Sequence, residues 1–155
     1  MRPRHIARSV RKVVMVSSIL TDGPAWGQKS SPGYVVTNAF GHVLEEKLIA
    51  EKYLRASGLD WTIVRPGGLK ADKPSGALVT SAENTLSTGE ISRDLVAEVC
   101  VSALTDAKSA NAVLEIVEGE PTAEYKAGKS YSNNFNEQLG IVQREAGLQR
   151  QNWGS

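Results

Sequence analysis

The chain has 155 residues, which suits one domain of ordinary size, and its 18 Lys plus Arg nearly balance its 17 Asp plus Glu, for a formal net charge of +1. This balance excludes a protein whose main work is electrostatic binding of nucleic acid or of an anionic membrane surface. The longest fully apolar run, Val13 to Val16, is far too short to cross a membrane, and one cysteine with two histidines argues against a disulfide framework or a zinc site.

The first segment of the chain is basic and leads into a strand. Residues 1–12 hold four arginines and a lysine, ahead of the first acidic residue, Asp22. Two interpretations stay open: the end of an organelle-targeting peptide, or a surface segment that leads into the next element. The apolar run Val13 to Val16 predicts a strand buried on both faces, as in a parallel sheet.

A long helix is predicted from Tyr34 to Ser57, with Gly58 at the position of a C-terminal cap. One stripe of this helix is apolar, and its members are Val36, Phe40, Val43, Ala50 and Leu54. Lys47 falls inside the stripe, where an unpaired ammonium is costly to bury. Either Lys47 faces a ligand in a cleft, or it extends to the rim of the stripe and pairs with Glu51 on the next turn.

The second half of the chain predicts two more main strands and a helix. Residues 61–64 form a strand that Arg65 and Pro66 end, and residues 113–117 form another. The connection at 70–90 holds a short strand at 77–80, and a helix over 93–104 follows, with Ser92 as its N-cap. Cys100 lies on the apolar side of that helix and is interpreted as a core residue and not as a nucleophile.

This order of strands and helices predicts an α/β fold with parallel strands and right-handed crossovers. Three such strands correspond to the C-terminal half of a doubly wound, Rossmann-like sheet. The G-x-G-x-x-G fingerprint that belongs to the N-terminal half of such a fold occurs nowhere in the chain. We therefore expect the chain to have as partner an N-terminal half or a larger protein complex.

Polar and glycine residues follow two of the predicted strands directly. Ser17 and Ser18 come after the first strand, and Pro66–Gly68 come at the end of the second. Open α/β sheets bind their ligands at the carboxyl ends of the strands. With Lys47 from the helix, these residues are expected to converge on one edge of the sheet. Simple turn chemistry is the alternative interpretation for the serines and the glycines.

Four segments, taken in order, resemble the atypical short-chain dehydrogenase/reductases. They are VVMVSS, the K-x-x-x-E pair of Lys47 and Glu51, SGLDWTIVRPGGL and ISRDLVAEV. The resemblance is to the C-terminal half of that NAD(P)-binding Rossmann fold and covers residues 8–118 approximately. The run NAFGHVLEEKLIAEKYLRASG is similar to a branch found in chloroplasts of plants and algae, which implies a chloroplast location.

The resemblance also implies a cofactor, NADP or NAD, and the residues that contact it. Ser18 takes the position of the family's active-site serine and Lys47 that of the lysine on the nicotinamide ribose, so both are candidate catalytic residues. Val43 stands where the family has its tyrosine, the general acid of hydride transfer, which argues against ordinary reductase chemistry. The implied cofactor-binding residues are Ser17, Ser18, Lys47, Pro66, Gly67, Gly68 and Leu69.

The expected organisation is a partial Rossmann-like domain over residues 1–118 and a polar arm or tail over residues 119–155, with a marginal helix at 136–150. A Y-x-x-x-K match at Tyr125 to Lys129 is rejected as a catalytic pair because it contains Gly128 and lies beyond the last strand. Two functions stay open. One is an NAD(P)-binding protein of oxidoreductase descent that is inactive as this chain alone. The other is a non-catalytic structural or accessory subunit of a larger, possibly photosynthetic, assembly, docked through its tail.

Overall fold

The computed structural model describes residues 9–122, 138–140, 142 and 144 of the chain. In chain order the elements are β1 (Lys12–Val16), η1 (Gly23–Trp26), α1 (Pro32–Asn38), α2 (Val43–Arg55), β2 (Asp60–Pro66), β3 (Gly68–Lys70), β4 (Gly76–Ser81), β5 (Glu90–Ser92), α3 (Arg93–Thr105), η2 (Ala107–Ser109) and β6 (Ala112–Pro121), where η marks a 3-10 helix. The strands predicted at 13–16, 61–64, 77–80 and 113–117 and the helix predicted at 93–104 are confirmed. None of the helices in the described ranges is long and apolar enough to span a bilayer.

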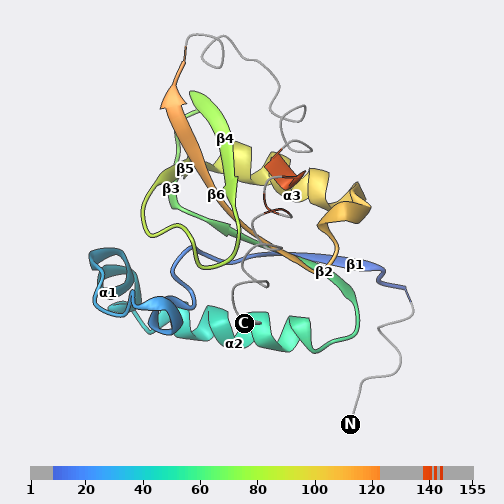
Figure 1. Cartoon of the computed structure of the whole chain (residues 1–155), viewed down its shortest axis with the longest axis horizontal. Coiled ribbons are helices and arrows are strands. Elements are labelled where there is room, and N and C mark those ends of the chain that lie inside the picture. Colours follow the sequence, from blue (N-terminus) through green and yellow to red (C-terminus); the bar gives the residue numbers. More distant parts are fainter. Residues whose placement is uncertain (1–8, 123–137, 141, 143, 145–155) are drawn as a thin grey trace.

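A four-stranded sheet forms the centre of the molecule, with strand order β1-β2-β6-β4 (Figure 1). Strands β1, β2 and β6 are parallel, and β4 pairs with β6 in the antiparallel direction. The short strands β3 and β5 form a separate parallel pair. The predicted α/β class with a mostly parallel, Rossmann-like sheet is therefore correct, and β4 adds one antiparallel strand to it.

Helices α2 and α3 lie on opposite sides of β1 and β2 (Figure 1). Successive side chains of a strand point to opposite faces of a sheet, and this alternation decides what each helix meets. Val64 of β2 joins the apolar core that α3 covers, whereas its neighbour Arg65 reaches Glu51 on α2. The α3 core is a single cluster, to which the helix contributes Leu95, Val96, Val99 and Ala103.

Helix α3 forms as its sequence predicts. The side chain of Ser92 caps its start by accepting a hydrogen bond from the N–H of Asp94 at 3.2 Å. Cys100 is half-buried against the α3 core, and burial raises the pKa of its thiol. A raised pKa keeps the thiol protonated, which agrees with a packing role.

The predicted long helix from residue 34 to residue 57 is wrong, because the structure divides it into α1 and α2. Gly41 and His42 separate the two helices with φ values of 82° and 55°, in the left-handed region that a continuous helix cannot contain. The break removes the predicted apolar stripe: Phe40 is 80% exposed, and α2 instead buries Leu44 and Glu51.

Strand β1 lies at the edge of the sheet, which corrects the prediction of a strand buried on both faces. Within residues 9–122 it pairs only with β2, and its apolar side chains are half-buried or, at Val16, 45% exposed. A strand at the edge has side chains of only one neighbouring strand beside its own on each face, and the outer side of β1 has no strand in the described part of the chain.

Lys12, at the start of β1, anchors this strand to the end of α3. Its ammonium donates hydrogen bonds to the carbonyls of Ala103 and Asp106 and to the hydroxyl of Ser109. Carbonyls at a helix C-terminus lack partners within the helix, and a cation there also meets the negative end of the helix dipole. The contact therefore completes α3 and holds β1 in place.

The C-terminal segment contributes to the core where it is described. Leu139 and Val142 are buried in the α3 core, and the N–H of Thr80 on β4 donates to the side chain of Gln138 at 3.0 Å. These residues are helical and fall within the helix predicted at 136–150. The expected domain boundary at residue 118 falls inside β6. The rejected Y-x-x-x-K match, and most of the tail that would dock on a larger assembly, lie outside the described residues.

Candidate functional site

Backbone hydrogen bonds bring the ends of β1 and β2 together at the carboxyl edge of the sheet. The N–H of Ser17 donates to the carbonyl of Val64 at 2.7 Å, and the N–H of Ile19 donates to the carbonyl of Pro66 at 3.0 Å. The two serines and the Pro-Gly-Gly segment are thus neighbours in space, as parallel strands require. Ligands of open α/β sheets bind at this kind of edge.

The two serines at this edge have different surroundings. Ser17 is buried, and its hydroxyl lies 3.2 Å from that of Thr21, which in turn donates to the carbonyl of Ser18 at 2.7 Å. The Ser18 side chain is half-buried, and no residue in the described ranges forms a hydrogen bond with its hydroxyl. Ser17 therefore stabilises the turn, and the hydroxyl of Ser18 is available to a ligand.

The two glycines that follow Pro66 also differ in their surroundings. Gly67 is buried, and a Cβ atom there would lie 2.4 Å from the carbonyl oxygen of Gly89, so the backbone itself requires a glycine. Gly68 begins β3 and is exposed, with room for a Cβ atom, and Leu69 is exposed beside it. The close backbone approach at Gly67 is therefore made by the chain and not by a ligand.

Lys47 lies half-buried on α2, one helical turn before Glu51. Of the two alternatives for Lys47, the pairing with Glu51 is not found, because the Glu51 carboxylate binds Arg65 and Arg55 instead. The forked guanidinium of an arginine fits a carboxylate better than a lysine on the same helix does. Lys47 takes part in no ion pair within the described residues.

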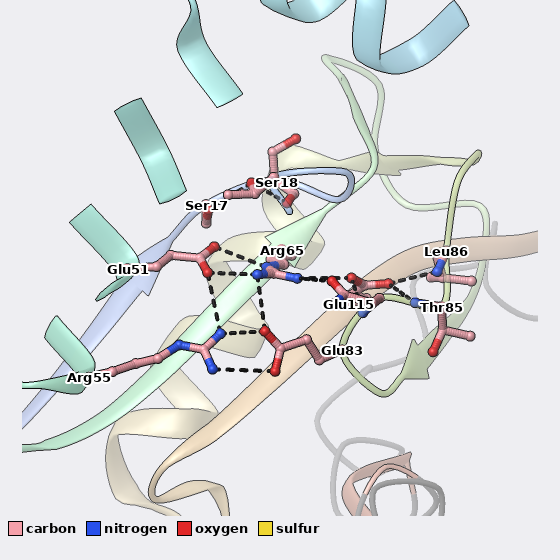
Figure 2. A network of polar contacts seen from close by, with 11 residues as sticks. Ser17, Ser18, Glu51, Arg55, Arg65, Glu83, Thr85, Leu86 and Glu115 are labelled. Carbon is pink, nitrogen blue, oxygen red and sulfur yellow. Dashed lines mark hydrogen bonds and ion pairs between the residues drawn. The ribbon is translucent and has the colours of Figure 1, made fainter. Parts of the chain in front are cut away.

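A buried ion network lies beside the two serines, with Arg65 of β2 at its centre (Figure 2). The Arg65 side chain is fully buried and donates five hydrogen bonds, one for each N–H of its guanidinium. Two of them reach the Glu51 carboxylate, from Nε at 3.0 Å and from Nη2 at 2.7 Å. The others go to Asn84 at 2.9 Å, Glu83 at 3.2 Å and Glu115 at 3.3 Å.

Glu115 of β6 extends the network to the loop that follows β4. One of its carboxylate oxygens accepts from Arg65 and from the N–H of Asn84, and the other accepts from the N–H groups of Thr85 and Leu86 at 3.0 and 2.7 Å. Successive backbone N–H groups of this kind make a concave anion site. The anion in this one is supplied by the protein itself, so the shape of the loop depends on Glu115.

The outer rim of the network is a second arginine–glutamate pair. Arg55 of α2 binds both carboxylate oxygens of Glu83, and its guanidinium stacks over the ring of Trp61 at 5.4 Å from the ring centre. Both charged side chains are one-third exposed, unlike the fully buried Glu51, Arg65 and Glu115. The side chains of the network are therefore fully buried at its centre and partly exposed to solvent at its outer rim.

The pKa values of the central pair shift so that both groups stay charged. Burial alone would raise the pKa of Glu51, but hydrogen bonds and charge from Arg65, with help from the Ser17 hydroxyl and Arg55, lower it overall. Burial alone would lower the pKa of Arg65, but Glu51, followed by Glu83 and Glu115, raises it.

A second carboxylate on β6, Glu118, has a similar role at a different place. Its oxygens accept from the N–H groups of Ser75 and Gly76 before β4 and from that of Ser92 at the start of α3. Burial opposes ionisation of Glu118, but these three backbone hydrogen bonds, with the charge of Lys70, lower its pKa overall.

The network was not predicted from the sequence, although two signals for it were present. Glu115 interrupts the apolar run V-L-E-I-V of one predicted strand, and Arg65 directly follows T-I-V at the end of another. A charged residue inside a buried strand needs a partner of opposite charge. That Arg65 and Glu115 each need a partner of opposite charge follows from that rule. Which residues those partners are depends on the packing of strands, helix and loop, which sequence patterns do not reveal.

The match to a family model now identifies the class of protein that this fold and edge define. Residues 6–107 match the NAD(P)H-binding family, and the chain belongs to that family. The predicted Rossmann-like, NAD(P)-binding family is therefore confirmed.

Relatives and a solved structure agree with this assignment. The chain is 54% identical over 110 residues to an uncharacterized chloroplastic protein of Arabidopsis thaliana, which covers 71% of this chain and 39% of that protein. It is 34% identical over 117 residues to an uncharacterized sugar epimerase of Bacillus subtilis, covering 74% of this chain and 49% of the epimerase. A candidate NAD-dependent epimerase/dehydratase from Bacillus halodurans superposes with a TM-score of 0.60 at 26% identity, over 80% of this chain and 50% of that one.

The extent of these matches bears on function. The chain spans 39% and 49% of the length of the two curated relatives and 50% of the solved structure. What it shares with them is therefore the family and the fold of the part that it covers.

Proposed function

We propose that this chain forms the nicotinamide side of an NAD(P) site in a protein of oxidoreductase descent. The observation that carries the proposal is the carboxyl edge of β1 and β2, where backbone hydrogen bonds hold Ser17 to Val64 and Ile19 to Pro66. This edge leaves the Ser18 hydroxyl available in a family that binds NAD(P)H. Open α/β sheets also bind their substrates at this edge, outside the carboxyl ends of the strands.

Each residue of the proposed site has a distinct role. Ser18 would hydrogen-bond a polar group of the substrate or of the nicotinamide amide, because a hydroxyl can both donate and accept. Lys47 would donate to the hydroxyls of the nicotinamide ribose, and Pro66, Gly68 and Leu69 would form the wall beside the ring. Bound NADP or NAD would supply the hydride chemistry, and the chain's own residues would orient the ring and the substrate.

Two features of the sequence bear on whether this chain is active by itself. Val43, at the start of α2, has no proton to give where the family carries its tyrosine, and no G-x-G-x-x-G fingerprint occurs in the 155 residues. We therefore propose that the chain alone is inactive and binds the dinucleotide weakly. Its chloroplastic relative from Arabidopsis supports a proposed chloroplast location.

A non-catalytic structural subunit is the second candidate, and Val43 favours it. In that case the fold is kept for packing, the Ser18 edge binds no nicotinamide, and the chain docks on a larger assembly. The two candidates differ in whether the edge binds a nicotinamide cofactor at all.

The test is an NMR titration of the ¹⁵N-labelled chain with NADPH and with nicotinamide mononucleotide at millimolar concentration. We expect resonance shifts at Ser18, Lys47 and Gly68 and none along α3. Lys47→Met should abolish them, whereas Lys52→Met, an exposed lysine on the same helix, should leave them unchanged. An edge that stays unperturbed in the wild-type chain would reject the cofactor role and favour the structural subunit.

Thermal unfolding gives an independent measure of the weak binding. NADPH at millimolar concentration should raise the Tm of the chain by less than about 4 °C, on the order of 1 kcal/mol of ligand linkage for a domain of this size. A larger increase would contradict weak binding by this chain alone.

A further inference from the structure

We propose that Arg65 is a positioning residue that fixes Ser18 through two routes that meet on its guanidinium. The inference rests on the proposed function, which assigns Ser18 to the nicotinamide side of the site. Arg65 itself does not touch the cofactor in this scheme. Its five hydrogen bonds reach Glu51 on one side and the residues of the loop after β4 on the other.

The first route runs through α2 and β2. Arg65 binds both oxygens of the Glu51 carboxylate on α2, which fixes its guanidinium (Figure 2). Val64, the residue before Arg65 in β2, accepts a hydrogen bond from the N–H of the buried Ser17 at 2.7 Å. The backbone before Ser18 is therefore bonded to β2 beside the arginine that Glu51 holds.

The second route runs through β6 and the loop. Arg65 binds Glu115, which accepts from the N–H of Leu86 at 2.7 Å. The Leu86 side chain packs against the cluster that contains Ile19 and Leu20, the two residues that follow Ser18. The backbone after Ser18 therefore depends on the loop that Glu115 holds.

Together the two routes hold the residues that precede and follow Ser18 in the chain. Catalytic and binding groups need support of this kind, because their own geometry has to be held by neighbours that are themselves fixed. All three charged side chains at the centre are fully buried, so solvent does not weaken their contacts.

The experiment measures amide hydrogen exchange in the full chain without any ligand. Glu115→Gln keeps the size of the side chain but removes its charge and one of its acceptor oxygens. Exchange at Ser17 and Ile19, whose N–H groups flank Ser18 and are bonded to β2, should become about tenfold faster. Exchange in the middle of α3, at Val99, should not change, because Val99 packs in the α3 core and that helix contributes no residue to the network.

Glu118→Gln is the matched control. Glu118 lies on the same strand and also accepts hydrogen bonds from backbone N–H groups, but its partners are Ser75, Gly76 and Ser92. The control should speed exchange at those partners and leave Ser17 and Ile19 unchanged. Equal acceleration at Ser17 and Ile19 in both variants would show general destabilisation and would overturn the proposal.

A second variant keeps the test decisive if Glu115→Gln does not fold. Glu51→Gln interrupts the other route and should also speed exchange at Ser17 and Ile19, with Glu46→Gln, on the exposed side of α2, as its control. Unchanged exchange at both amides in Glu51→Gln would reject the positioning role.

Failure of the positioning role can be distinguished from failure of the proposed function. If the variants speed exchange at Ser17 and Ile19 but NADPH does not shift Ser18 in the wild-type chain, then the network positions this turn and the cofactor role fails. If NADPH shifts Ser18 equally in the wild-type chain and in Glu115→Gln, and exchange is also unchanged, then the cofactor role holds and the positioning role fails.

Discussion

The centre of the sheet buries charged side chains, whereas its edge leaves apolar side chains partly exposed. Strands β2 and β6 bury charged residues completely, at Arg65 and Glu115, and every N–H of the arginine has an acceptor on α2, on β6 or in the loop after β4. Strand β1, which follows Lys12 with four apolar residues, leaves its side chains half-exposed. The difference teaches that place in the strand order, and not the polarity of a strand, decides its burial here.

Arg65→Met should have the largest effect, because it removes the cation from the closed centre. The Glu51 and Glu115 carboxylates would then lose their buried partner, and breaking such a pair from one side costs about 3–5 kcal/mol of the free energy of unfolding. Urea unfolding followed by circular dichroism measures the loss. Arg93→Met, an exposed arginine at the start of α3, is the control and should stay within about 0.5 kcal/mol of the wild-type chain.

Glu118→Gln should have an intermediate effect, because it weakens a charged acceptor at a buried site outside the network. Loss of charge-assisted hydrogen bonds costs about 1.5–3 kcal/mol at neutral pH. Since the folded protein lowers the pKa of Glu118, its contribution is present above the unfolded-state pKa and is lost as the pH falls through the folded-state pKa. The difference between the wild-type chain and the variant should therefore shrink on acidification. A difference in urea midpoint that grows towards acid pH would contradict this account.

Val16→Lys tests the open edge and should change association more than stability. An apolar edge strand with free backbone groups favours pairing with another chain, so the wild-type chain should self-associate. Val16 is already 45% exposed, and a lysine there should shift the chain towards the monomer with less than about 0.5 kcal/mol of change in stability. Size-exclusion chromatography with light scattering measures this. A wild-type chain that is monomeric and unfolds cooperatively would show that the edge needs no partner.

Lys47→Met should have the smallest effect on stability, at about 0.5 kcal/mol or less in either direction. Lys47 has no ion pair within the part of the chain that the structure describes, and methionine keeps the length and packing of its stem. If the free energy of unfolding in urea falls by more than about 2 kcal/mol, then Lys47 stabilises the folded state and is not available to a ligand.

The main elements of the fold could be predicted because apolar periodicity marks them. The strands around Val64 and Leu114 and the helix capped by Ser92 follow from apolar runs, spacing and capping. The break between α1 and α2 was missed, although Gly41 inside a helical pattern gave a signal for it. That break also explains why the predicted stripe across both helices does not exist.

The candidate site could be predicted in part. The approach of the two serines to Pro66 follows from parallel strand topology and is found in the structure. The partner of Glu51 could not be identified from spacing along one helix, because Arg65 comes from a different element. Long-range ion pairs depend on which strand lies next to which helix, and a local pattern contains no information about that.

The attachment of Lys12 has a consequence for the order in which the molecule assembles. Its ammonium contacts Ala103, Asp106 and Ser109, which lie 91 to 97 residues further along the chain. During synthesis β1 is made before α3 and η2, so this attachment has to wait until η2 has been added. Contacts over such separations form slowly because a long loop must close first. Strand β1 is thus attached to α3 only after the segments between them have been made.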